Sequence, residues 1–482
     1  MFPNTADITR SLNSRASALK DFPRKTGSPK NCVIERPKTA VRTENVDFSR
    51  HQGHKKAVER AAQKRRVFSF CAENVTALLW KVRTQMSALF GTYARSDLAF
   101  VRGEGMRLFT DDGTAYLDFN SGIGVNALGH HDKHMLDALK EQAEKIWHVS
   151  NVFTIPQAEQ LAQRLVDVTF ADAVFFTNSG TEAVECAIKT ARRYFYDKGE
   201  KERFGIIAFT GSFHGRTIGA IAAGGNPSYL EGFGPPLEGF RHTAPGDLKA
   251  VEALIDDKTA AILIEPVQGE GGVTAMSSEF LQGLRKLCDD HGMLLILDEV
   301  QCGYARTGMF SAHEWAGITP DIMAVAKGIG GGFPLGACLA TAQVAKSMVP
   351  GTHGSTYGGN PLACAVGNAV LDRILAPGFI EHVNEMGQLL NWHLHQLQQR
   401  FPQLVLETRG KGLIAGIKIT PPVRDFVDRL RQHKLLAVAA GDNVLRFLPP
   451  LIATQADVEE AMAIVADAFI EFDKETAENS KA

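Results

Sequence analysis

The sequence predicts an α/β protein with a large domain, built on a mostly parallel sheet flanked by helices, and a smaller α/β domain made from both ends of the chain. Three observations predict this class. The chain has 482 residues, of which 44% are hydrophobic and 22% charged, so it can bury a large core. Short apolar runs alternate with helical patterns between about residues 150 and 345. Several runs are continuously apolar, as in parallel strands that are covered on both faces.

The elements are predicted in chain order from periodicity and turn signals. The stretch "LAFVRGEGMRLFTDDGTAYLDF" alternates around Asp112-Gly113 and indicates two strands joined by a turn. After about residue 375 the pattern restarts with a long helix through Gln399, short strands and a closing helix from Gln455. The predicted strands between them are Ala173–Thr177, Gly205–Phe209, Ala260–Glu265, Met293–Val300 and Ala337–Thr341, and the predicted helices are His134–Trp147, Gln157–Val166, Glu182–Tyr196 and Ser278–His291.

Four segments follow from this pattern. Residues 86–145 are predicted to begin the small domain, 146–375 to form the large domain, and 376–482 to complete the small one. Residues 1–85 carry 18 Lys and Arg against 7 Asp and Glu. They have no long amphipathic face and no regular basic and aromatic pattern, so we expect a weakly ordered extension. A transit peptide, or an arm that binds nucleic acid or a membrane surface beside a vestigial pocket, stays open as the alternative.

Composition excludes several other classes of protein. No apolar run reaches the roughly 18 residues of a membrane span. His130, His131 and His134 lie close in the sequence, but no carboxylate pattern accompanies them, so packing within a turn is preferred to a metal site. Seven cysteines without paired spacing suit a reducing compartment: Cys32, Cys71, Cys186, Cys288, Cys302, Cys338 and Cys364. We therefore expect a cytoplasmic protein without a metal and with neither nucleic acid nor membrane as partner.

The first candidate site is the turn Asn178-Ser179-Gly180-Thr181 in "FFTNSGTEAVECAIK", between a strand and a helix. Small residues at a helix start leave backbone N–H groups free, and the helix dipole favours an anion such as phosphate there. An ordinary helix cap is the alternative interpretation of this turn.

Two further candidates follow strands. "FTGSFHGRT" places the aromatic Phe213 beside His214 and Arg216, and a flat aromatic near a phosphate site can stack on a ring. Core packing of Phe213 and a surface ion pair of Arg216 are the alternatives. "LIEPVQGEGG" ends a strand at Glu265 and places Glu270 in a glycine-rich loop, a common arrangement that adds little alone.

A lysine and an acid complete the set. Lys327 follows the apolar run "IMAVA" and precedes glycines, so its amine should be partly desolvated and available as a nucleophile that forms a Schiff base. In "ILDEVQCGYARTG" the acids Asp298 and Glu299 end a buried strand, where open α/β sheets bind ligands. Either acid could instead cap the next helix.

Together these features predict a site for pyridoxal 5'-phosphate. The aldehyde of this cofactor needs a lysine, its phosphate an anion site, and its ring nitrogen an acid that keeps it protonated. We assign Lys327 and Asp298 to these roles, and Gln301 is close enough along the turn to reach the ring hydroxyl. Four weak signals in this order are far stronger than any one of them.

Six motifs resemble the successive motifs of class III pyridoxal-phosphate aminotransferases: "NSGTEAVE", "SFHGRT", "EPVQGEGGV", "LDEVQCGYARTG", "AKGIGGGFP" and "HGSTYGGNPLACA". "GIGVNALGH", "WHVSNVFT" and "LRFLPPL" resemble the branch of the family that acts on acetylornithine. The resemblance covers roughly residues 90 to 470. It implies the fold of fold-type I transferases, with a seven-stranded sheet, and a homodimer.

By matching position, the resemblance also implies the role of each site residue. The residues implied to hold the cofactor are Lys327 as its Schiff-base partner, Asp298 at the ring nitrogen, Gly180 and Thr181 at the phosphate, Phe213 on the ring, and Thr356 at the phosphate of the neighbouring subunit. The residues implied to bind substrate are Arg446 at the α-carboxylate, Glu270 as its partner when a diamine is bound, and Arg216 with Ser355 at the far end of the substrate.

The implied reaction moves the terminal amino group of acetylornithine to 2-oxoglutarate and produces N-acetylglutamate 5-semialdehyde and glutamate, a step of arginine biosynthesis. Two arginines at opposite ends of a site suit a dicarboxylate, because guanidinium binds carboxylate bidentately. Ornithine, succinylornithine, succinyldiaminopimelate or 4-aminobutyrate as the amino donor, and an aminomutase activity, remain open alternatives within the same fold.

Overall fold

The computed structural model describes residues 88–479, and the chain divides into two units, Met1–Arg95 and Ser96–Ala482. The prediction made for residues 1–85 lies outside the described residues. Within residues 88–479, all helices and strands belong to the second unit. The boundaries of the predicted domains stay a prediction.

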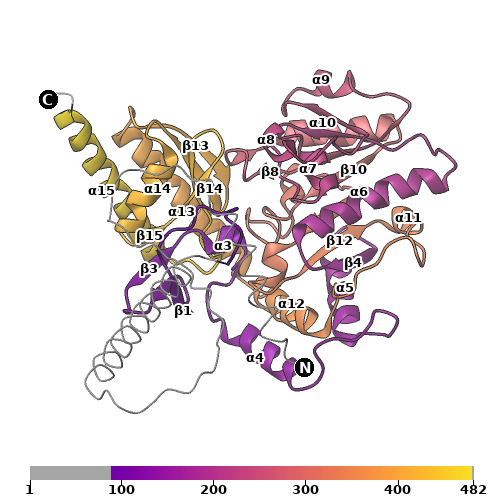
Figure 1. The fold of residues 1–482 in the computed structure, drawn as a ribbon, viewed down its shortest axis with the longest axis horizontal. Coiled ribbons are helices and arrows are strands. Elements are labelled where there is room, and N and C mark those ends of the chain that lie inside the picture. The colour runs from indigo at the N-terminus through magenta and orange to yellow at the C-terminus, as the bar shows by residue number, and fades with distance from the viewer. Residues whose placement is uncertain (1–87, 480–482) are drawn as a thin grey trace, which may run out of the picture. The chain divides into compact units, whose positions relative to one another are not determined.

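A seven-stranded sheet of order β4-β12-β11-β10-β7-β5-β6 organises the middle of the chain (Figure 1). The pairs β11–β10, β10–β7, β7–β5 and β5–β6 are parallel, and β12 runs antiparallel to both of its neighbours. The mostly parallel sheet is thus confirmed. Its strands are β4 (Ala173–Thr177), β5 (Gly205–Phe209), β6 (Phe240–Thr243), β7 (Thr259–Ile264), β10 (Leu294–Asp298), β11 (Ile322–Val325) and β12 (Gly336–Ala340).

Helices cover both faces of this sheet, as predicted. Alternate residues of β10 point to opposite faces: Leu294 and Ile296 pack with α6, and Leu295 and Leu297 pack with α10. Every residue of β7 and β10 is buried, which explains why both are apolar except for Thr259 at the start of β7 and Asp298 at the end of β10. The helices of this part are α4 (Lys133–Ala143), α5 (Pro156–Val168), α6 (Gly180–Asp197), α7 (Ile218–Gly224), α8 (Pro227–Leu230), α9 (Leu248–Glu252), α10 (Ser278–Asp290), α11 (Ala342–Ala345) and α12 (Pro361–Ile374).

Strand β6 has no counterpart among the predicted strands. Its sequence FRHT contains two basic side chains, and each of its residues is only partly buried. β6 pairs with β5 alone and forms an edge of the sheet. An edge strand can carry polar residues because one of its sides is not covered by another strand, so it lacks the apolar run that reveals an inner strand.

Segments from both chain ends share a second, four-stranded sheet. It has the order β1-β2-β3-β15, in which β3 and β15 pair in parallel across more than 300 residues of sequence. Figure 1 shows these indigo strands beside the yellow carboxyl-terminal elements. The predicted turn at Asp112-Gly113 joins β2 to β3. The elements before α4 are β1 (Phe100–Glu104), β2 (Arg107–Thr110), β3 (Ala115–Asp118) and α3 (Ser121–Gly124).

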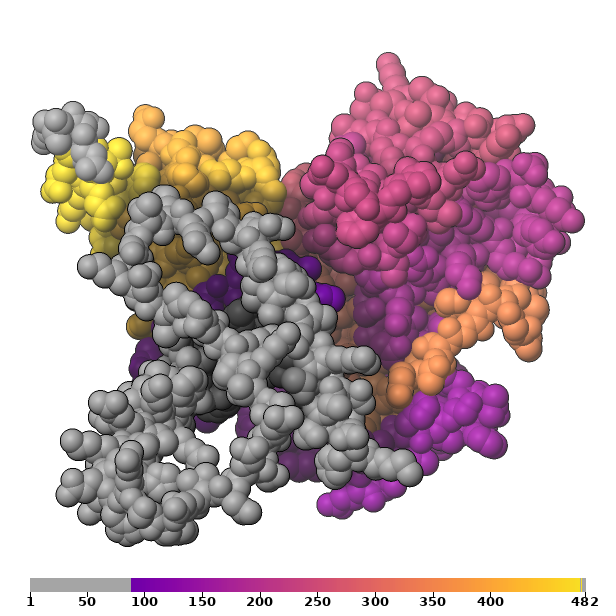
Figure 2. All heavy atoms as spheres, in the orientation of Figure 1, coloured from indigo at the N-terminus to yellow at the C-terminus, as the bar shows by residue number. Residues whose placement is uncertain are grey.

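A third sheet, β13-β14-β17-β16, lies in the carboxyl-terminal part, and β8 pairs with β9. Figure 2 shows the yellow and orange atoms of this part gathered on one side of the viewed face and the magenta atoms around the seven-stranded sheet on the other. The remaining elements are β8 (Val267–Gln268), β9 (Thr274–Ala275), the 3-10 helices η1 (Ala312–Ala316) and η2 (Lys327–Gly330), α13 (Phe379–Arg400), β13 (Val405–Lys411), β14 (Ile414–Ile419), α14 (Val423–Gln432), β15 (Leu435–Leu436), β16 (Val438–Ala440), β17 (Val444–Phe447) and α15 (Gln455–Asn479).

Two of the three histidines considered as metal ligands have separate partners. His130 Nε2 lies 2.8 Å from Asp118 Oδ2, and His134 Nε2 lies 2.8 Å from Asp372 Oδ2. Within residues 88–479, no group of three or more His, Cys, Asp or Glu side chains is arranged to hold a metal ion.

Two other features were predicted from composition. The five cysteines in the described part of the chain are free and buried. Over the same part, no single helix is long and apolar enough to cross a membrane, and α12 and α13 pass that test only as a pair bent by 72°.

Candidate active site

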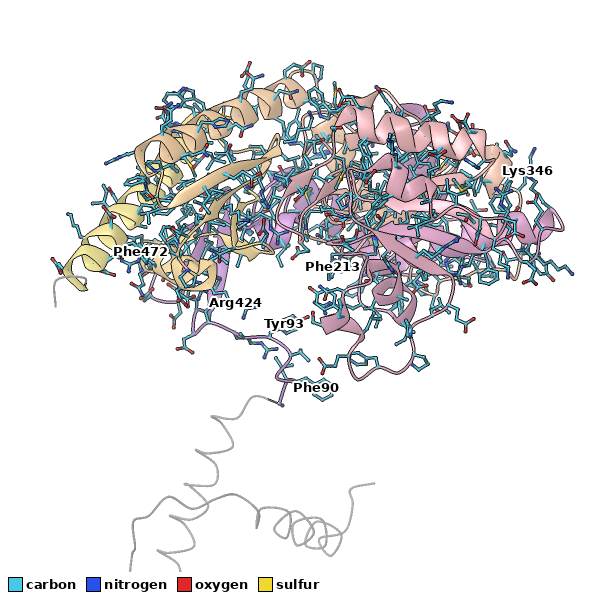
Figure 3. All side chains as sticks on the ribbon, turned by 90° about the horizontal axis from the view of Figure 1, so that it is seen from above. Phe90, Tyr93, Phe213, Lys346, Arg424 and Phe472 are labelled. Atoms are coloured by element: carbon cyan, nitrogen blue, oxygen red, sulfur yellow. The ribbon has the colours of Figure 1, made fainter. Side chains whose placement is uncertain are left out.

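A cavity of about 380 Å³ lies where several strands of the seven-stranded sheet end. It is lined by residues at or after the ends of β4, β5, β7, β10 and β11, so the carboxyl ends of these strands meet at the cavity. Phe213, labelled in Figure 3, lies on the side of the pink elements that faces the yellow and purple ones. The lining includes Thr181, Phe213, Glu265, Asp298, Gln301 and Lys327.

The start of α6 forms one wall of the cavity. Ser179 caps this helix by accepting a hydrogen bond from the Glu182 N–H at 3.3 Å. The backbone N–H groups of Gly180 and Thr181 have no hydrogen-bond acceptor within the helix, so they can donate hydrogen bonds to an anion. Gly180 allows close packing here, because a Cβ at this position would lie 2.6 Å from Val300 Cγ1.

Lys327 enters the cavity from the end of β11. It begins η2 with φ of 51°, a left-handed conformation that is uncommon for a residue with a side chain. Burial lowers the pKa of its amine to about 8, although nearby Glu270 acts in the opposite direction. With this pKa, an appreciable fraction of the Lys327 amine is uncharged near neutral pH, and the uncharged amine is the nucleophilic form.

Asp298, at the end of β10, and His214 form a buried pair at the cavity. His214 Nδ1 lies 2.8 Å from Asp298 Oδ2, while Asp298 Oδ1 accepts a hydrogen bond from the Val300 N–H at 3.0 Å. The exposed fractions of the His214 and Asp298 side chains are 0% and 3%. His214 Nε2 is buried and has no hydrogen-bond partner among the described residues. The pair therefore fixes the orientation of the carboxylate that was assigned to the ring nitrogen.

A second buried acid, Glu265, lies at the end of β7. Its Oε1 accepts a hydrogen bond from the Phe213 N–H at 2.8 Å. Burial and, after it, the charge of Asp298 raise its pKa well above the usual value for a glutamate. Glu265 thus holds the backbone of the aromatic residue that lines the cavity.

Arg446, Glu270 and Gln301 form a polar cluster at the cavity. Arg446 Nη1 donates to Glu270 Oε1 at 2.7 Å and to Gln301 Oε1 at 2.9 Å. Arg446 is fully buried in β17, and its Nε and Nη2 have no hydrogen-bond partner in residues 88–479. Burial alone would raise the pKa of Glu270, but the Arg446 guanidinium brings it below the usual value.

Arg216 lies beside the start of α6. Its backbone N–H donates to Thr181 Oγ1 at 3.1 Å. Its guanidinium carbon lies 4.0 Å from the centre of the Tyr229 ring and 5.2 Å from that of Phe213. The surface ion pair considered for Arg216 has no counterpart among the described residues.

Ser355 and Thr356 line a second hollow of about 430 Å³, which shares Asn178 with the cavity. Asn178 Nδ2 donates to Ser355 Oγ at 3.4 Å, and the Gly358 N–H donates to the same oxygen at 2.8 Å. Thr356 is exposed and does not line the first cavity.

The structure thus brings most of the predicted site residues together. Gly180, Thr181, Phe213, Glu270, Asp298, Gln301 and Lys327 line one cavity, with Arg446 bound to two of them and Arg216 beside Thr181. Sequence reasoning assigned no role to His214, Glu265 or Tyr229. The first two follow strands, a position that could have identified them, but no pattern in the sequence points to Tyr229.

Comparison with known proteins places this geometry in a family. Residues 92–469 match the model of the family described as aminotransferase class-III. The chain is similar to the solved ornithine aminotransferase of Toxoplasma gondii, with TM-score 0.77 and 30% identity over 80% of this chain and 93% of that one. The N-acetylornithine aminotransferase of Stenotrophomonas maltophilia gives 0.69 and 35% over 79% and 97%. The chain belongs to the class III aminotransferases.

Curated relatives are more similar still. The acetylornithine aminotransferase of Agrobacterium fabrum is 58% identical over 377 residues, which cover 78% of this chain and 94% of the relative. That of Brucella melitensis is 57% identical over 379 residues, or 79% of this chain and 94% of the relative.

Class III aminotransferases use pyridoxal 5'-phosphate, and this is the cofactor of the chain. The site fits it on three observations. Lys327 offers an amine whose pKa is lowered to about 8, and the start of α6 offers unpaired N–H groups for a phosphate. Asp298 offers a buried carboxylate that is held in place by His214.

Proposed function

We propose that this enzyme transfers the terminal amino group of N2-acetyl-L-ornithine to 2-oxoglutarate and releases N-acetyl-L-glutamate 5-semialdehyde and L-glutamate, a step of arginine biosynthesis. The arrangement of Arg446 and Arg216 carries the proposal: one guanidinium is buried against Glu270, and the other has no ion-pair partner in the described residues. Two cationic groups at different places in one site suit a dicarboxylate acceptor. The names of the similar relatives agree with acetylornithine as the amino donor.

The cofactor would be held by Lys327, by the start of α6 at Gly180 and Thr181, by Phe213 against the ring, and by Asp298 and Gln301 at the ring's polar atoms. When bound, pyridoxal phosphate supplies a carbonyl that takes up an amino group and a ring that withdraws electrons. Asp298 favours protonation of the ring nitrogen, because a buried carboxylate stabilises a nearby positive charge.

Lys327 is the proposed acid and base. With a pKa near 8, its Nζ can accept the proton that leaves the amine-bearing carbon of the donor and return it to a neighbouring atom. Lys327 is partly buried and lines the cavity, so its amine can reach a substrate that is bound there. No other lysine lines the cavity formed by the described residues.

Arg446 and Glu270 are proposed to adapt the site to two substrates. The donor presents an ammonium end, and Glu270 neutralises Arg446 while that end is bound. The acceptor presents a carboxylate next to its keto group, which replaces Glu270 as the partner of Arg446. Arg446 Nη2 is a second buried donor that such a carboxylate can engage bidentately.

Arg216 is proposed to bind the far end of either substrate, assisted by Ser355. In acetylornithine this end carries the α-carboxylate and the acetylated amine, and in 2-oxoglutarate it carries the second carboxylate. A panel of amino donors assayed with 2-oxoglutarate tests the assignment, and acetylornithine should give the highest kcat/KM. The similarity to an ornithine aminotransferase makes ornithine the main alternative donor.

We further infer that the enzyme acts as a cytoplasmic homodimer in which Thr356 completes the phosphate site of the partner subunit. Support comes from the exposed loop that carries Thr356 and from the apolar side chains near it. Tyr357 is 62% exposed, and its ring lies 5.1 Å from that of His148. Trp147 and Phe153 are 66% and 64% exposed, as expected for residues that a second copy covers.

A further inference from the structure

The guanidinium of Arg216 is held in an unusual way for an arginine beside a binding site. In the part of the chain that the structure describes, it forms no ion pair and donates no side-chain hydrogen bond. Its carbon instead lies 4.0 Å from the centre of the Tyr229 ring, a close cation–π contact. A guanidinium that rests on a ring keeps its N–H groups free at its edge, whereas an ion pair would occupy them.

Tyr229 is itself firmly placed. It belongs to the short helix α8, where its N–H donates to Asn226 O at 3.0 Å and the Asn226 side chain accepts from the Ser228 N–H at 3.0 Å. The preceding turn needs glycine at Gly225, which has φ of 62°. A Cβ there would also lie 2.6 Å from the ring of His242. These contacts hold the backbone from which the Tyr229 side chain projects.

Tyr229 also contacts the aromatic residue that lines the cofactor cavity. The Phe213 and Tyr229 rings meet edge to face, with their centres 6.0 Å apart and an interplanar angle of 87°. Arg216, three residues after Phe213, is in reach of both rings. The cluster formed by Phe213, Arg216 and Tyr229 thus links the cofactor cavity to the α7–α8 segment.

We propose that Tyr229 is a positioning residue that determines specificity for substrates with an anionic far end. Its ring orients the Arg216 guanidinium and leaves the N–H groups free to bind the distal carboxylate of the donor or acceptor. This inference deepens the proposed function and rests on the role given there to Arg216. Tyr229 acts through Arg216 and needs no contact with the reacting atoms.

The test uses the holoenzyme and glutarate, an unreactive dicarboxylate, as the probe. Replacing the ring in Tyr229→Leu should weaken glutarate binding about three- to tenfold by calorimetry, the range expected for a partly exposed cation–π contact. Tyr229→Phe keeps the ring and should bind like the wild type. In steady-state assays, Tyr229→Leu should raise the KM for 2-oxoglutarate by the same factor and leave kcat unchanged.

Pyruvate separates positioning from general damage, because it has the keto acid group of 2-oxoglutarate but no distal carboxylate. Its KM should stay the same in Tyr229→Leu. Tyr196→Leu is the matched control: Arg193 lies 5.1 Å from the Tyr196 ring on α6, and neither residue lines the cavity. This variant should behave like the wild type with every ligand.

Arg216→Ala distinguishes failure of this inference from failure of the proposed function. If Arg216→Ala weakens glutarate binding and Tyr229→Leu does not, the role of Tyr229 is wrong and the proposed function stands. If Tyr229→Leu weakens the use of pyruvate and 2-oxoglutarate equally, the positioning role is also wrong. If Arg216→Ala binds glutarate as the wild type does, the far end of the substrate has been assigned to the wrong residue, and both proposals fall.

Discussion

Glu270→Gln is the substitution that most directly tests how one site accepts two different substrates. In the structure, Glu270 Oε1 accepts a hydrogen bond from the buried Arg446 Nη1 at 2.7 Å. Glutamine keeps the shape of the side chain and removes its charge. A carboxylate acceptor then no longer competes with Glu270 for Arg446, so the KM for 2-oxoglutarate should fall. The donor meets a guanidinium that no charge neutralises, so the KM for acetylornithine should rise.

The magnitude follows from the burial of the pair. A hydrogen bond between charged groups is worth about 1.5–3 kcal/mol. Arg446 is fully buried but Glu270 is 30% exposed, so the lower end of that range applies. We expect each KM to change about tenfold, in opposite directions, and their ratio about a hundredfold. Because Glu270 raises the pKa of Lys327, the substitution should also lower that pKa further below about 8.

The assay is single-turnover absorbance, which follows each half of the reaction separately with one substrate. Glu141→Gln is the matched control, because Glu141 Oε1 also accepts from a cationic group, Lys145 Nζ, at 2.7 Å, but on an exposed helix surface. It should leave both halves unchanged. Unaltered constants for both substrates in Glu270→Gln, or a parallel rise in both, would refute the reasoning.

Three further predictions concern the cofactor site. Lys327→Ala should lower turnover at least about a thousandfold, since the amine and the proton carrier are lost together. In the wild-type enzyme, reduction with borohydride should leave the cofactor attached to the peptide that contains Lys327. An adduct on another lysine would contradict this. Because burial lowers the pKa of Lys327 to about 8, the rate at which the cofactor-free enzyme takes up pyridoxal phosphate should rise with pH and level off above about 8, and a rate that falls over this range would exclude Lys327 as the nucleophile. Mixtures of inactive Lys327→Ala and inactive Thr356→Ala chains should regain activity, and no gain despite demonstrated subunit exchange would count against a shared site.

The inner strands could be predicted from the sequence because burial on both faces makes them continuously apolar. β5 was predicted at its observed bounds, and β7, β10 and β12 lie within two residues of theirs. β4 is an edge strand and was still predicted at its observed bounds, because its sequence AVFFT is almost entirely apolar. β6 could not be predicted, because an edge strand needs no apolar run. The pairing of β3 with β15 was also beyond any local pattern, since it depends on the path of a chain segment of more than 300 residues.

The same contrast holds within the site. The positions of Lys327 and Asp298 at the cavity could be predicted, since they lie at the carboxyl ends of buried strands, where open α/β sheets bind ligands. What holds each of them depends on tertiary contacts. His214 orients Asp298 from 84 residues away, and Glu270 meets Arg446 across 176 residues. No spacing rule in the sequence relates such partners.

These long-range partners explain how a single lysine can serve both halves of the reaction. The pKa of Lys327 is raised by Glu270 and lowered by Arg446, so the amine responds to the charge of that pair. In the proposed cycle Arg446 always has an anionic partner, first Glu270 and then the acceptor carboxylate. Lys327 therefore never faces an uncompensated guanidinium, and its amine can exchange protons near neutral pH in both directions. Glu270→Gln removes this compensation whenever no carboxylate is bound to Arg446, so its effect on proton transfer should appear in the donor half of the reaction and not in the acceptor half.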